Sequence, residues 1–347
     1  MDMFQDLGLE EWADQRESGK AITMIDVRSP SEFAESTIPG SLNIPLFDDQ
    51  ERAEIGTLYK QVSVDAAKQR GLEIVSAKLP DFVRKFAEIS GRKAVFCWRG
   101  GMRSRTTATL LSLMDIHTYR LAGGYRAYRQ WVVGTLENMD FAPELTVIHG
   151  NTGSGKTLLL RKLQEQGYPV IDLEGMAGHR GSVFGQIGLH AHNQKMFDSL
   201  LLEDLLRFED APYVLMEAES KRIGKVVVPD FLMAKKEQGR HLRIDLPTDV
   251  RVQIILEDYE PWNHPEACLQ AFRKIKSKIH TPIAAEIDQS LLAGRYDRTI
   301  ELLLIYYYDP RYAHTEEQYE EAEFTVIRAG SVDEAVEEAK RLLPNPV

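Results

Sequence analysis

One cysteine of the chain stands where a strand is expected to run into a helix, beside a pair of glycines. Cys97 ends the apolar run 93–97, and the six residues after it are those that we expect to hold an anion: Trp98, Arg99, Gly100, Gly101, Met102 and Arg103. A thiol in such a turn faces backbone N–H groups and the positive end of the next helix, which favour the thiolate. The guanidinium groups of Arg99 and Arg103 favour it further. We therefore interpret Cys97 as a nucleophile, the alternative being a buried structural cysteine.

Two chemistries share this kind of loop. Cys97 and Arg103 are six positions apart, which is the spacing of cysteine phosphatases, where the arginine clamps a phosphate. The same loop suits a sulfurtransferase, whose thiolate carries a persulfide held by backbone amides. The residues of the loop alone leave both chemistries open.

The segments around the cysteine loop resemble the rhodanese domain in order and spacing. They are residues 26–33, 38–45, Cys97 and 123–126, and the resemblance covers roughly residues 10–133. It favours the sulfurtransferase interpretation of the loop. It also implies an architectural role, in a buried network of carboxylates and guanidinium groups, for Asp26, Arg28 and Glu32.

A second loop carries a complete phosphate-binding pattern, G-x-x-x-x-G-K-T. The pattern follows an expected strand at 145–149 and precedes an expected helix at 158–166, which is the context in which it binds phosphate. Its amides would point at a diphosphate, Lys156 would neutralise charge, and Thr157 would coordinate Mg²⁺ if a metal is used. We therefore predict a diphosphate site formed by Gly150, Asn151, Thr152, Gly153, Ser154, Gly155, Lys156 and Thr157.

Acidic residues that end apolar runs are candidates for ligand contacts. Asp172 and Glu174 follow one such run, and Glu217 and Glu219 follow another. A hydrolytic enzyme with this kind of phosphate loop usually carries an acid that handles Mg²⁺. These four residues do not reproduce the usual arrangement with a water-positioning group. The phosphate loop therefore indicates diphosphate binding more firmly than ATP hydrolysis.

Three more residues are candidates for contacts with a ligand or substrate. His179 and Arg180 lie in the glycine-rich stretch 172–182 and either meet an anion or belong to a solvated loop. Arg222 lies in the stretch 217–224, which follows an expected strand. The carboxyl ends of strands are where α/β proteins bind ligands.

A cluster of cations is the candidate for RNA contacts. Four basic residues fall within six positions, shortly after Tyr259 and Trp262: Arg273, Lys274, Lys276 and Lys278. Phosphate contacts by the cations and stacking by the aromatic rings would suit tRNA. The alternative is a solvated helix face.

These residues need a scaffold of alternating strands and helices, so we predict an α/β fold. The expected strands are 22–27, 93–97, 118–121, 145–149, 168–172, 213–217, 240–246 and 323–328, and the expected helices include 105–114, 158–166, 193–208 and 332–342. We divide the chain into a rhodanese-like domain (1–135), a linker (136–143) and a P-loop NTPase-like domain (144–347). The last of these includes a helical extension (248–318) and a closing strand and helix.

Composition excludes several classes of protein. The chain has 347 residues, 43% of them hydrophobic, and two cysteines, too few for a disulfide framework. No apolar run is long enough to cross a membrane and the start lacks a secretory pattern, so we expect a cytoplasmic protein without a membrane partner. Of the net charge of −11, −6 falls in residues 309–347, which leaves room for basic surfaces elsewhere. His190 and His192 lack a third metal ligand, and Cys268 is expected to be inert.

The whole chain resembles the tRNA 2-selenouridine synthase family. The resemblance rests on the two loops together with residues 123–129, 172–185, 219–224 and 307–310. It implies that sulfur is replaced by selenium in the wobble 2-thiouridine of tRNA. It also implies an S-geranyl-2-thiouridine intermediate made from geranyl diphosphate, then selenophosphate as the selenium supply, and no tightly bound cofactor. The phosphate loop would bind geranyl diphosphate or a nucleotide, and Cys97 would carry a perselenide or attack the substrate.

Other functions remain open from the sequence. One is a rhodanese-type sulfurtransferase coupled to an ATP-dependent kinase or adenylating domain. Another is an RNA-binding regulator that does no chemistry and senses a ligand through the phosphate loop. A phosphatase is the most distant alternative. Neither the selected tRNAs, a Mg²⁺ requirement nor the oligomeric state follows from the sequence.

Overall fold

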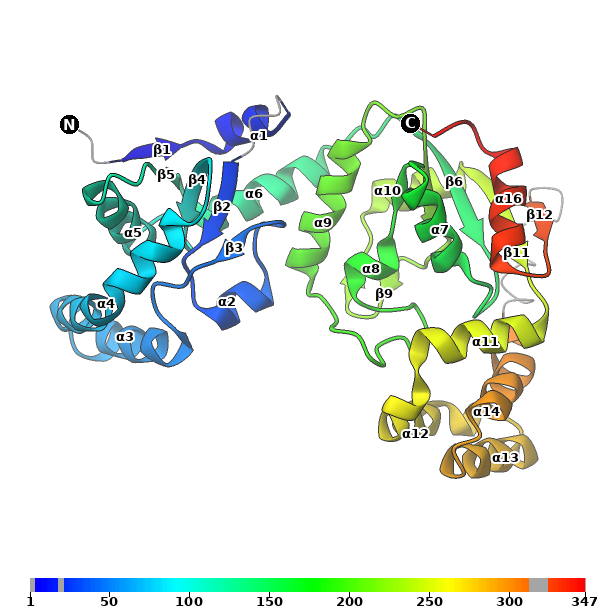
Figure 1. Ribbon diagram of the computed structural model, residues 1–347. Coiled ribbons are helices and arrows are strands. Elements are labelled where there is room, and N and C mark those ends of the chain that lie inside the picture. Colours follow the sequence, from blue (N-terminus) through cyan, green and yellow to red (C-terminus); the bar gives the residue numbers. More distant parts are fainter. Residues whose placement is uncertain (1–3, 18–21, 312–323, 347) are drawn as a thin grey trace. The chain divides into compact units, whose positions relative to one another are not determined.

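The computed structural model describes residues 4–17, 22–311 and 324–346. The chain forms two compact units, one of residues 1–138 with 198–200 and the other of residues 139–197 with 201–347. Helix α6 (Gly124–Glu137) continues into the segment expected as a linker, so residues 136 and 137 are helical. The predicted α/β class is confirmed, because each unit is built on a parallel sheet (Figure 1).

The first unit is a five-stranded parallel sheet in the order β1-β5-β4-β2-β3. Its strands are β1 (Gln5–Leu7), β2 (Ile22–Asp26), β3 (Leu42–Asn43), β4 (Arg92–Phe96) and β5 (Tyr119–Leu121). Its other helices are α1 (Leu9–Glu17), α2 (Pro30–Glu35), α3 (Asp49–Gln61), α4 (Val64–Ala87) and α5 (Met102–Leu113). Helix α5 begins three residues before the expected start at 105, so the cysteine loop is shorter than the sequence indicated.

The second unit contains another five-stranded parallel sheet, in the order β12-β11-β6-β8-β7. Its strands are β6 (Glu144–His149), β7 (Val170–Ile171), β8 (Tyr213–Glu217), β11 (Arg240–Asp245) and β12 (Phe324–Arg328), and β9 (Arg222–Ile223) pairs antiparallel with β10 (Val226–Val227). The surrounding helices are α7 (Lys156–Glu165), α8 (Leu173–Ala177), α9 (Gln194–Arg207), α10 (Asp230–Glu237) and α16 (Val332–Leu342). The phosphate loop follows β6, the middle strand.

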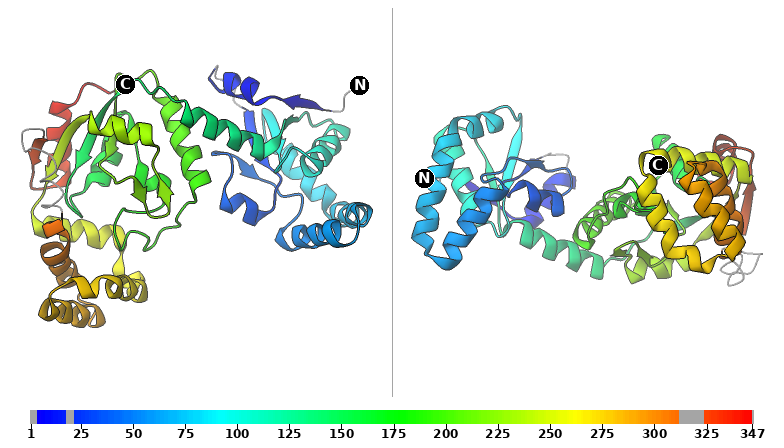
Figure 2. Two further views of the ribbon diagram at one scale, coloured as in Figure 1. Left: turned by 180° about the vertical axis from the view of Figure 1, so that it is seen from behind. Right: turned by 90° about the horizontal axis from the view of Figure 1, so that it is seen from below.

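Helices α7 and α16 cover one face of this second sheet. Leu159 and Leu163 of α7 are buried in one core cluster with Ala335 and Ala339 of α16. The small alanine side chains allow the two helices to approach each other and the strands closely. Helix α10 lies on the other face of the sheet (Figures 1 and 2). Burial on both faces explains why β6 and β8 read as continuous apolar runs.

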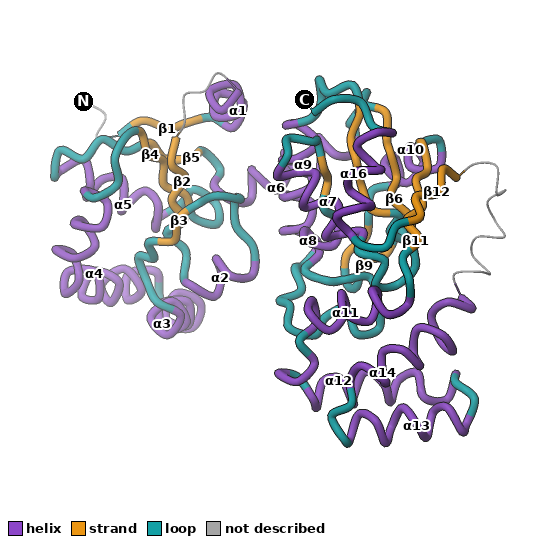
Figure 3. Tube along the Cα trace, turned by 45° about the vertical axis from the view of Figure 1, so that its right-hand side comes forward, coloured by secondary structure: helices purple, strands orange, loops and turns teal. Residues whose placement is uncertain are grey.

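A helical extension follows β11 and has a core of its own. It consists of α11 (Thr248–Tyr259), η1 (Pro261–Asn263), α12 (Pro265–Ile275), η2 (Lys276–Lys278), α13 (Thr281–Leu292), α14 (Tyr296–Leu303) and the π-helical turn η3 (Leu304–Tyr308). Cys268, Phe272, Ile287 and Leu303 are buried together within it. Figure 3 shows α12, α13 and α14 grouped at one end of the unit, next to α11.

The expected helical segment 248–318 agrees with the structure through residue 311, and its last residues, 312–318, lie outside the described part of the chain. Among the described residues, we find no helix with the length and apolar character that crossing a bilayer requires.

Candidate functional site

Cys97 lies directly after β4, at the base of the cysteine loop. Its side chain is 4% exposed and packs with the core of the first unit, and its Sγ lies 3.2 Å from Oγ of Ser104. The outer part of the loop is open to solvent: Trp98, Arg99, Gly101 and Met102 are exposed. Gly101 is the N-cap of α5 and offers no side chain to its first amides. The loop therefore presents uncapped backbone N–H groups to a bound anion above a buried thiol.

Arg103 is not free to serve an anion alone, because Glu32 holds it. Nη1 of Arg103 lies 2.5 Å from one Glu32 oxygen and Nη2 lies 3.1 Å from the other. Burial opposes the ionisation of Glu32, but the hydrogen bond and charge of Arg103 outweigh it and lower the pKa of this carboxyl. The sequence grouped Glu32 with Asp26 and Arg28, whereas the structure joins it to the cysteine loop.

Asp26 and Arg28 form the buried pair that was expected of them. Their side chains are 0% and 2% exposed, and Nη2 of Arg28 lies 2.6 Å from Oδ2 of Asp26. The same Nη2 donates to the Ser36 carbonyl at 2.6 Å, while Thr37 donates to Asp26 at 2.9 Å. The Arg28 guanidinium also stacks on Tyr125, 4.3 Å from the ring centre. This pair is satisfied on all sides, as a buried ion pair must be to persist.

The glycine pair 123–124 holds the cysteine loop in place. A Cβ on Gly124 would lie 2.2 Å from the Cys97 carbonyl oxygen and 2.4 Å from the Gly100 nitrogen, and its φ is +61°. The next two amides donate into the loop, Tyr125 to Cys97 at 2.9 Å and Arg126 to Trp98 at 2.8 Å. Only glycine permits this approach and this backbone conformation. The motif at 123–126 is therefore part of the same site as Cys97.

The phosphate loop has the geometry that its pattern predicts. Gly153 and Gly155 have φ of +75° and +74°, and a Cβ on them would lie 2.6 Å from Ile255 and 2.8 Å from Val332. Nζ of Lys156 donates to the Gly150 carbonyl at 2.8 Å, so the ammonium lies over the loop. Helix α7 begins at Lys156 with a glycine N-cap, which leaves its first amides without a side-chain cap. These N–H groups and the ammonium suit a diphosphate.

An ion pair between the buried Arg251 and the half-buried Asp309, which sequence reasoning missed, holds the phosphate loop in place. Nη2 of Arg251 lies 2.7 Å from Asp309 and also donates to the Thr152 carbonyl at 2.8 Å. Asn151 donates to the same Asp309 carboxylate at 3.1 Å. The π-helical turn η3 ends just before Asp309, and such turns often mark functional sites. Asp309 had a signal, since it lies in the segment 307–310 of the family resemblance, whereas Arg251 had none.

We expect Asp309→Ala to weaken the binding of inorganic pyrophosphate about tenfold, which corresponds to about 1.4 kcal/mol. The substitution leaves the buried Arg251 without its carboxylate and frees the loop that both residues hold. Isothermal titration calorimetry measures the affinity. Asp297→Ala, at an exposed acid on α14, is the control and should match the unsubstituted protein. Equal affinities for the two variants would exclude a role of Asp309 in shaping the loop.

Carboxyl groups gather opposite the phosphate loop. Thr157 donates its hydroxyl to Glu174 at 2.9 Å. Burial, with the charge of Glu219, raises the pKa of Glu174 to about 8. Glu217 is fully buried, accepts from the Leu173 amide at 3.1 Å, and has one oxygen without a hydrogen-bond partner among the described residues. Burial and neighbouring carboxylates, Asp172 first among them, raise its pKa well above the ordinary value. Glu174 is therefore largely protonated at neutral pH, and burial favours the protonated form of Glu217.

The loop and its carboxyl group fit a magnesium ion bound together with a diphosphate. Mg²⁺ commonly takes one or two protein oxygens and completes its shell with phosphates and water. Thr157 and Glu174 would hold it here, Glu174 after losing its proton to the solvent, and the ion would neutralise charge on the diphosphate. No group of three or more His, Cys, Asp or Glu in the described part of the chain could hold a metal ion by itself.

The raised pKa of Glu217 predicts how stability changes with pH. A carboxyl that ionises near 4.5 when unfolded and higher when folded takes up a proton on folding, so the free energy of unfolding falls as pH rises between the two values. The slope is about 1.4 kcal/mol per pH unit for each such group. We expect Glu217→Gln to remove one group's share of this slope above pH 4.5. Urea unfolding between pH 5 and 8 measures it, and a slope unchanged by the substitution would contradict the assignment.

Some of the remaining candidate site residues contact other parts of the protein, and others are exposed to solvent. Asp172 caps α8 by accepting from the Gly175 amide at 2.7 Å. His179 accepts from the Gly181 amide at 3.1 Å, and burial lowers the pKa of its ring. Arg180 pairs with Asp258 at 2.6 Å and stacks on Tyr259, which directs it toward the protein rather than toward an anion. Arg222 is exposed on β9, and Lys236 donates to the Glu219 carbonyl at 2.7 Å.

The four cations expected to contact RNA lie at the end of α12 and in η2, and all are exposed: Arg273, Lys274, Lys276 and Lys278. Asp288 pairs with Lys276 at 2.6 Å. Trp262 is exposed in η1, which precedes α12, whereas Tyr259 lies under Arg180 and is not available for stacking.

The two units are similar to two different known domains. A rhodanese-like domain matches residues 9–130, and the tRNA 2-selenouridine synthase AAA domain matches residues 143–281. The tRNA 2-selenouridine synthase of Cupriavidus necator is 33% identical to the chain, over 86% of the chain and 89% of the relative. The chain belongs to the tRNA 2-selenouridine synthase family.

Two further relatives of the same name support this assignment to the tRNA 2-selenouridine synthase family. The protein of Nitrosomonas europaea is 35% identical, over 74% of the chain and 69% of the relative. The protein of Photobacterium profundum is 31% identical, over 84% of the chain and 88% of the relative. In this member of the family, the rhodanese-like match contains Cys97 and the AAA match contains the phosphate loop.

Proposed function

We propose that this protein is a cytoplasmic transferase that replaces sulfur by selenium in the wobble 2-thiouridine of tRNA. Membership of the family supports the overall reaction, since the relatives carry that name. The observation that carries the proposal is that one chain holds both a phosphate loop with uncapped amides and a cysteine loop of the rhodanese type. Each loop suits one of two successive steps.

The first step is transfer of a geranyl group to the thiouridine sulfur. The sulfur attacks C1 of geranyl diphosphate, the C1–O bond breaks, diphosphate leaves with the electron pair, and the pyrimidine loses its N3 proton. The phosphate loop stabilises the charge that builds on the leaving group, through its amides and Lys156. Without a bound metal ion, Glu174 is neutral below its pKa of about 8, so it does not repel the diphosphate.

The second step is the exchange of sulfur for selenium. The Cys97 thiolate attacks C2 of the pyrimidine, the bond between C2 and the geranylated sulfur breaks, and geranylthiol leaves after taking a proton. Selenium from selenophosphate then attacks C2, and the bond between C2 and Sγ of Cys97 breaks, which restores the thiolate. Water then cleaves the selenium–phosphorus bond and releases phosphate. Cys97 acts in this step, and the uncapped amides of its loop hold the anionic selenium donor. Alkylation of the sulfur in the first step is what makes it a good leaving group in the second.

The exposed cations of α12 and η2 are the proposed contact with the tRNA backbone. Arg273, Lys274 and Lys278 face solvent, and the exposed Trp262 lies on the same helical extension. Binding through such cations weakens steeply with added salt. The wobble position that the family modifies would then be presented to the protein by its anticodon loop.

Mass spectrometry of nucleosides tests the proposed function. Thiolated tRNA is incubated with the protein, geranyl diphosphate and selenophosphate, and with each small molecule omitted in turn. We expect 2-selenouridine from the complete mixture, S-geranyl-2-thiouridine when selenophosphate is omitted, and unchanged 2-thiouridine when geranyl diphosphate is omitted. Formation of 2-selenouridine without geranyl diphosphate, or a requirement for ATP in its place, would overturn the proposal.

A further inference from the structure

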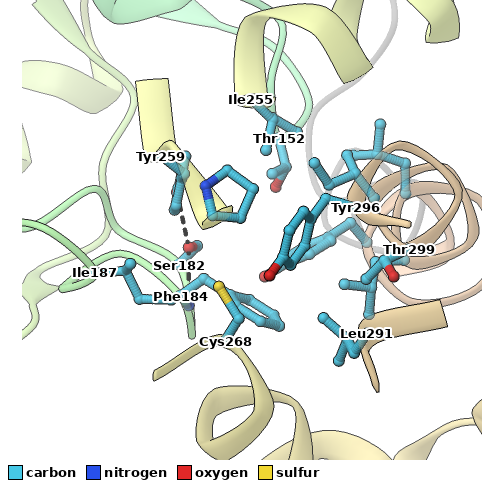
Figure 4. A pocket seen from close by; sticks show the side chains of 15 residues that line it. Thr152, Ser182, Phe184, Ile187, Ile255, Tyr259, Cys268, Leu291, Tyr296 and Thr299 are labelled. Carbon is cyan, nitrogen blue, oxygen red and sulfur yellow. Dashed lines mark hydrogen bonds between the residues drawn. The ribbon is translucent and has the colours of Figure 1, made fainter. Parts of the chain in front are cut away.

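An apolar cavity adjoins the phosphate loop. It is partly open to solvent, and none of the fifteen described residues that line it is charged. The wall combines residues of the phosphate loop, the loop after α8 and the helical extension, among them Thr152, Phe184, Ile255, Cys268, Leu291 and Tyr296 (Figure 4).

Three hydroxyl groups of this wall are already paired with one another or with their own helix. The hydroxyls of Ser182 and Tyr259 lie 3.2 Å apart and share a hydrogen bond. Thr299 donates to the Arg295 carbonyl of its own helix at 3.1 Å. A nucleobase needs partners for the polar groups on its edge, and a hydrocarbon chain needs none. The cavity therefore favours an apolar occupant.

The loop that forms one side of the cavity is held by Arg180. Its Nη1 donates to the Ile187 carbonyl at 2.8 Å, and its guanidinium pairs with Asp258 at 2.6 Å. It also stacks on Tyr259, 4.4 Å from the ring centre. Arg180 thus ties residues 182–187 to α11, so the cavity wall is built before any ligand arrives. Arg180, which belongs to the 172–185 motif, is therefore a positioning residue for the cavity wall.

Thr152 links the cavity to the phosphate loop, since it belongs to both. A ligand that occupies both sites must carry a diphosphate at one end and a hydrocarbon chain at the other. We propose that the cavity holds the prenyl chain of an allylic diphosphate whose head group binds the phosphate loop. This inference rests on the proposed function and names the site that would select the alkyl donor.

The depth of the cavity would set the length of the accepted chain. Figure 4 shows Thr152 at one end of the cavity and Leu291 at the other. Leu291 is 8% exposed, while its neighbour Leu292 on the same helix is 72% exposed. Enlarging Leu291 shortens the cavity without touching the phosphate loop. The same substitution at Leu292 enlarges a side chain that lies outside the cavity.

Calorimetry with geranyl S-thiolodiphosphate, which keeps the chain but reacts slowly, and with inorganic pyrophosphate tests the proposal. Each buried methylene contributes about fourfold in affinity, so the unsubstituted protein should bind the geranyl analogue about 100-fold or more tightly than pyrophosphate. Leu291→Trp should remove about 30-fold or more of that preference and leave pyrophosphate within about twofold. Leu292→Trp should behave as the unsubstituted protein.

A second measurement needs no substitution. Cys268 lines the cavity, and site-resolved mass spectrometry can follow its slow alkylation by N-ethylmaleimide in the intact protein. The geranyl analogue should slow this reaction at least about fivefold and pyrophosphate should not, because only the analogue fills the cavity.

Equal binding of the analogue and pyrophosphate, or equal losses in the two leucine variants, would overturn the cavity proposal. Loss of ATP affinity in Leu291→Trp in place of analogue affinity would assign the cavity to a nucleobase and overturn it too. A different result would overturn the proposed function, namely that the unsubstituted protein transfers no geranyl group to thiolated tRNA.

Discussion

Lys156→Ala is expected to lower the rate of geranyl transfer by about 100-fold or more while leaving selenation of already geranylated tRNA within about twofold. The ammonium lies over the phosphate loop, 2.8 Å from the Gly150 carbonyl, where the departing diphosphate gathers charge. Its removal costs stabilisation that is larger in the transition state than in the bound substrate. Single-turnover assays with 2-thiouridine tRNA and with S-geranyl-2-thiouridine tRNA measure the two steps separately.

Lys162→Ala is the matched control for this prediction. Lys162 lies on the same helix, α7, and pairs with Asp333 at the surface at 2.5 Å. It carries the same charge but does not lie in the phosphate loop, so both steps should keep their rates. An equal loss of selenation in Lys156→Ala would contradict the assignment of the phosphate loop to the first step.

The opposite pattern is expected for Cys97→Ala. Selenation of geranylated tRNA should fall about a thousandfold or more, since the thiol is the proposed nucleophile, whereas geranyl transfer should stay within about twofold. The same two single-turnover assays measure this. Leu113→Ala, at an exposed position on α5, is the control for a change on the helix that follows the loop. Selenation that survives in Cys97→Ala would assign the cysteine a structural role.

The burial of Cys97 makes the stability of that variant part of the test. Its side chain packs with core residues such as Ile25 and Val27, as a structural cysteine would, while the loop above it is exposed. Loss of Sγ leaves a small cavity, and the surrounding core then loses packing contacts. A thermal unfolding curve close to that of the unsubstituted protein, together with lost selenation, separates chemistry from packing.

The sequence located both loops, because each is a continuous pattern between a strand and a helix. Gly150, Gly153 and Gly155 all have positive φ, which glycine adopts more easily than other residues. Their role in shaping the loop can therefore be predicted from this short segment alone. The glycine pair at 123–124 was also visible as a motif. Its contact with the Cys97 carbonyl, however, depends on how β4 and α6 come together in the fold.

Contacts between distant segments could not be inferred in this way. Arg251 and Asp309 are 58 positions apart, and only the fold brings them together under the phosphate loop. Arg180 was a candidate for an anion contact, with a solvated loop as the alternative, but Asp258 and Tyr259 of a later helix hold it. The sequence shows the type and charge of a residue, but not which distant residue it contacts.

The apolar cavity could not be predicted from the sequence either, because distant segments form it. Its wall combines Phe184, Ile255 and Leu291, which belong to segments that read as an irregular loop and as polar helices. Cys268 was expected to be inert on a helix, and the helix proves to line a cavity. Hydrophobic periodicity indicates which face of a helix is buried, but not that a space remains beside it.

A mixing experiment tests the central claim most directly, namely that the two loops serve successive steps on one base. Thiolated tRNA, geranyl diphosphate and selenophosphate are incubated with Cys97→Ala alone, with Lys156→Ala alone and with both variants together, and 2-selenouridine is measured by mass spectrometry. Neither variant alone should form it. The mixture should, because geranylated tRNA released by the first variant is the substrate of the second. A mixture that forms no 2-selenouridine, when each variant has retained its own half-reaction, would contradict the claim.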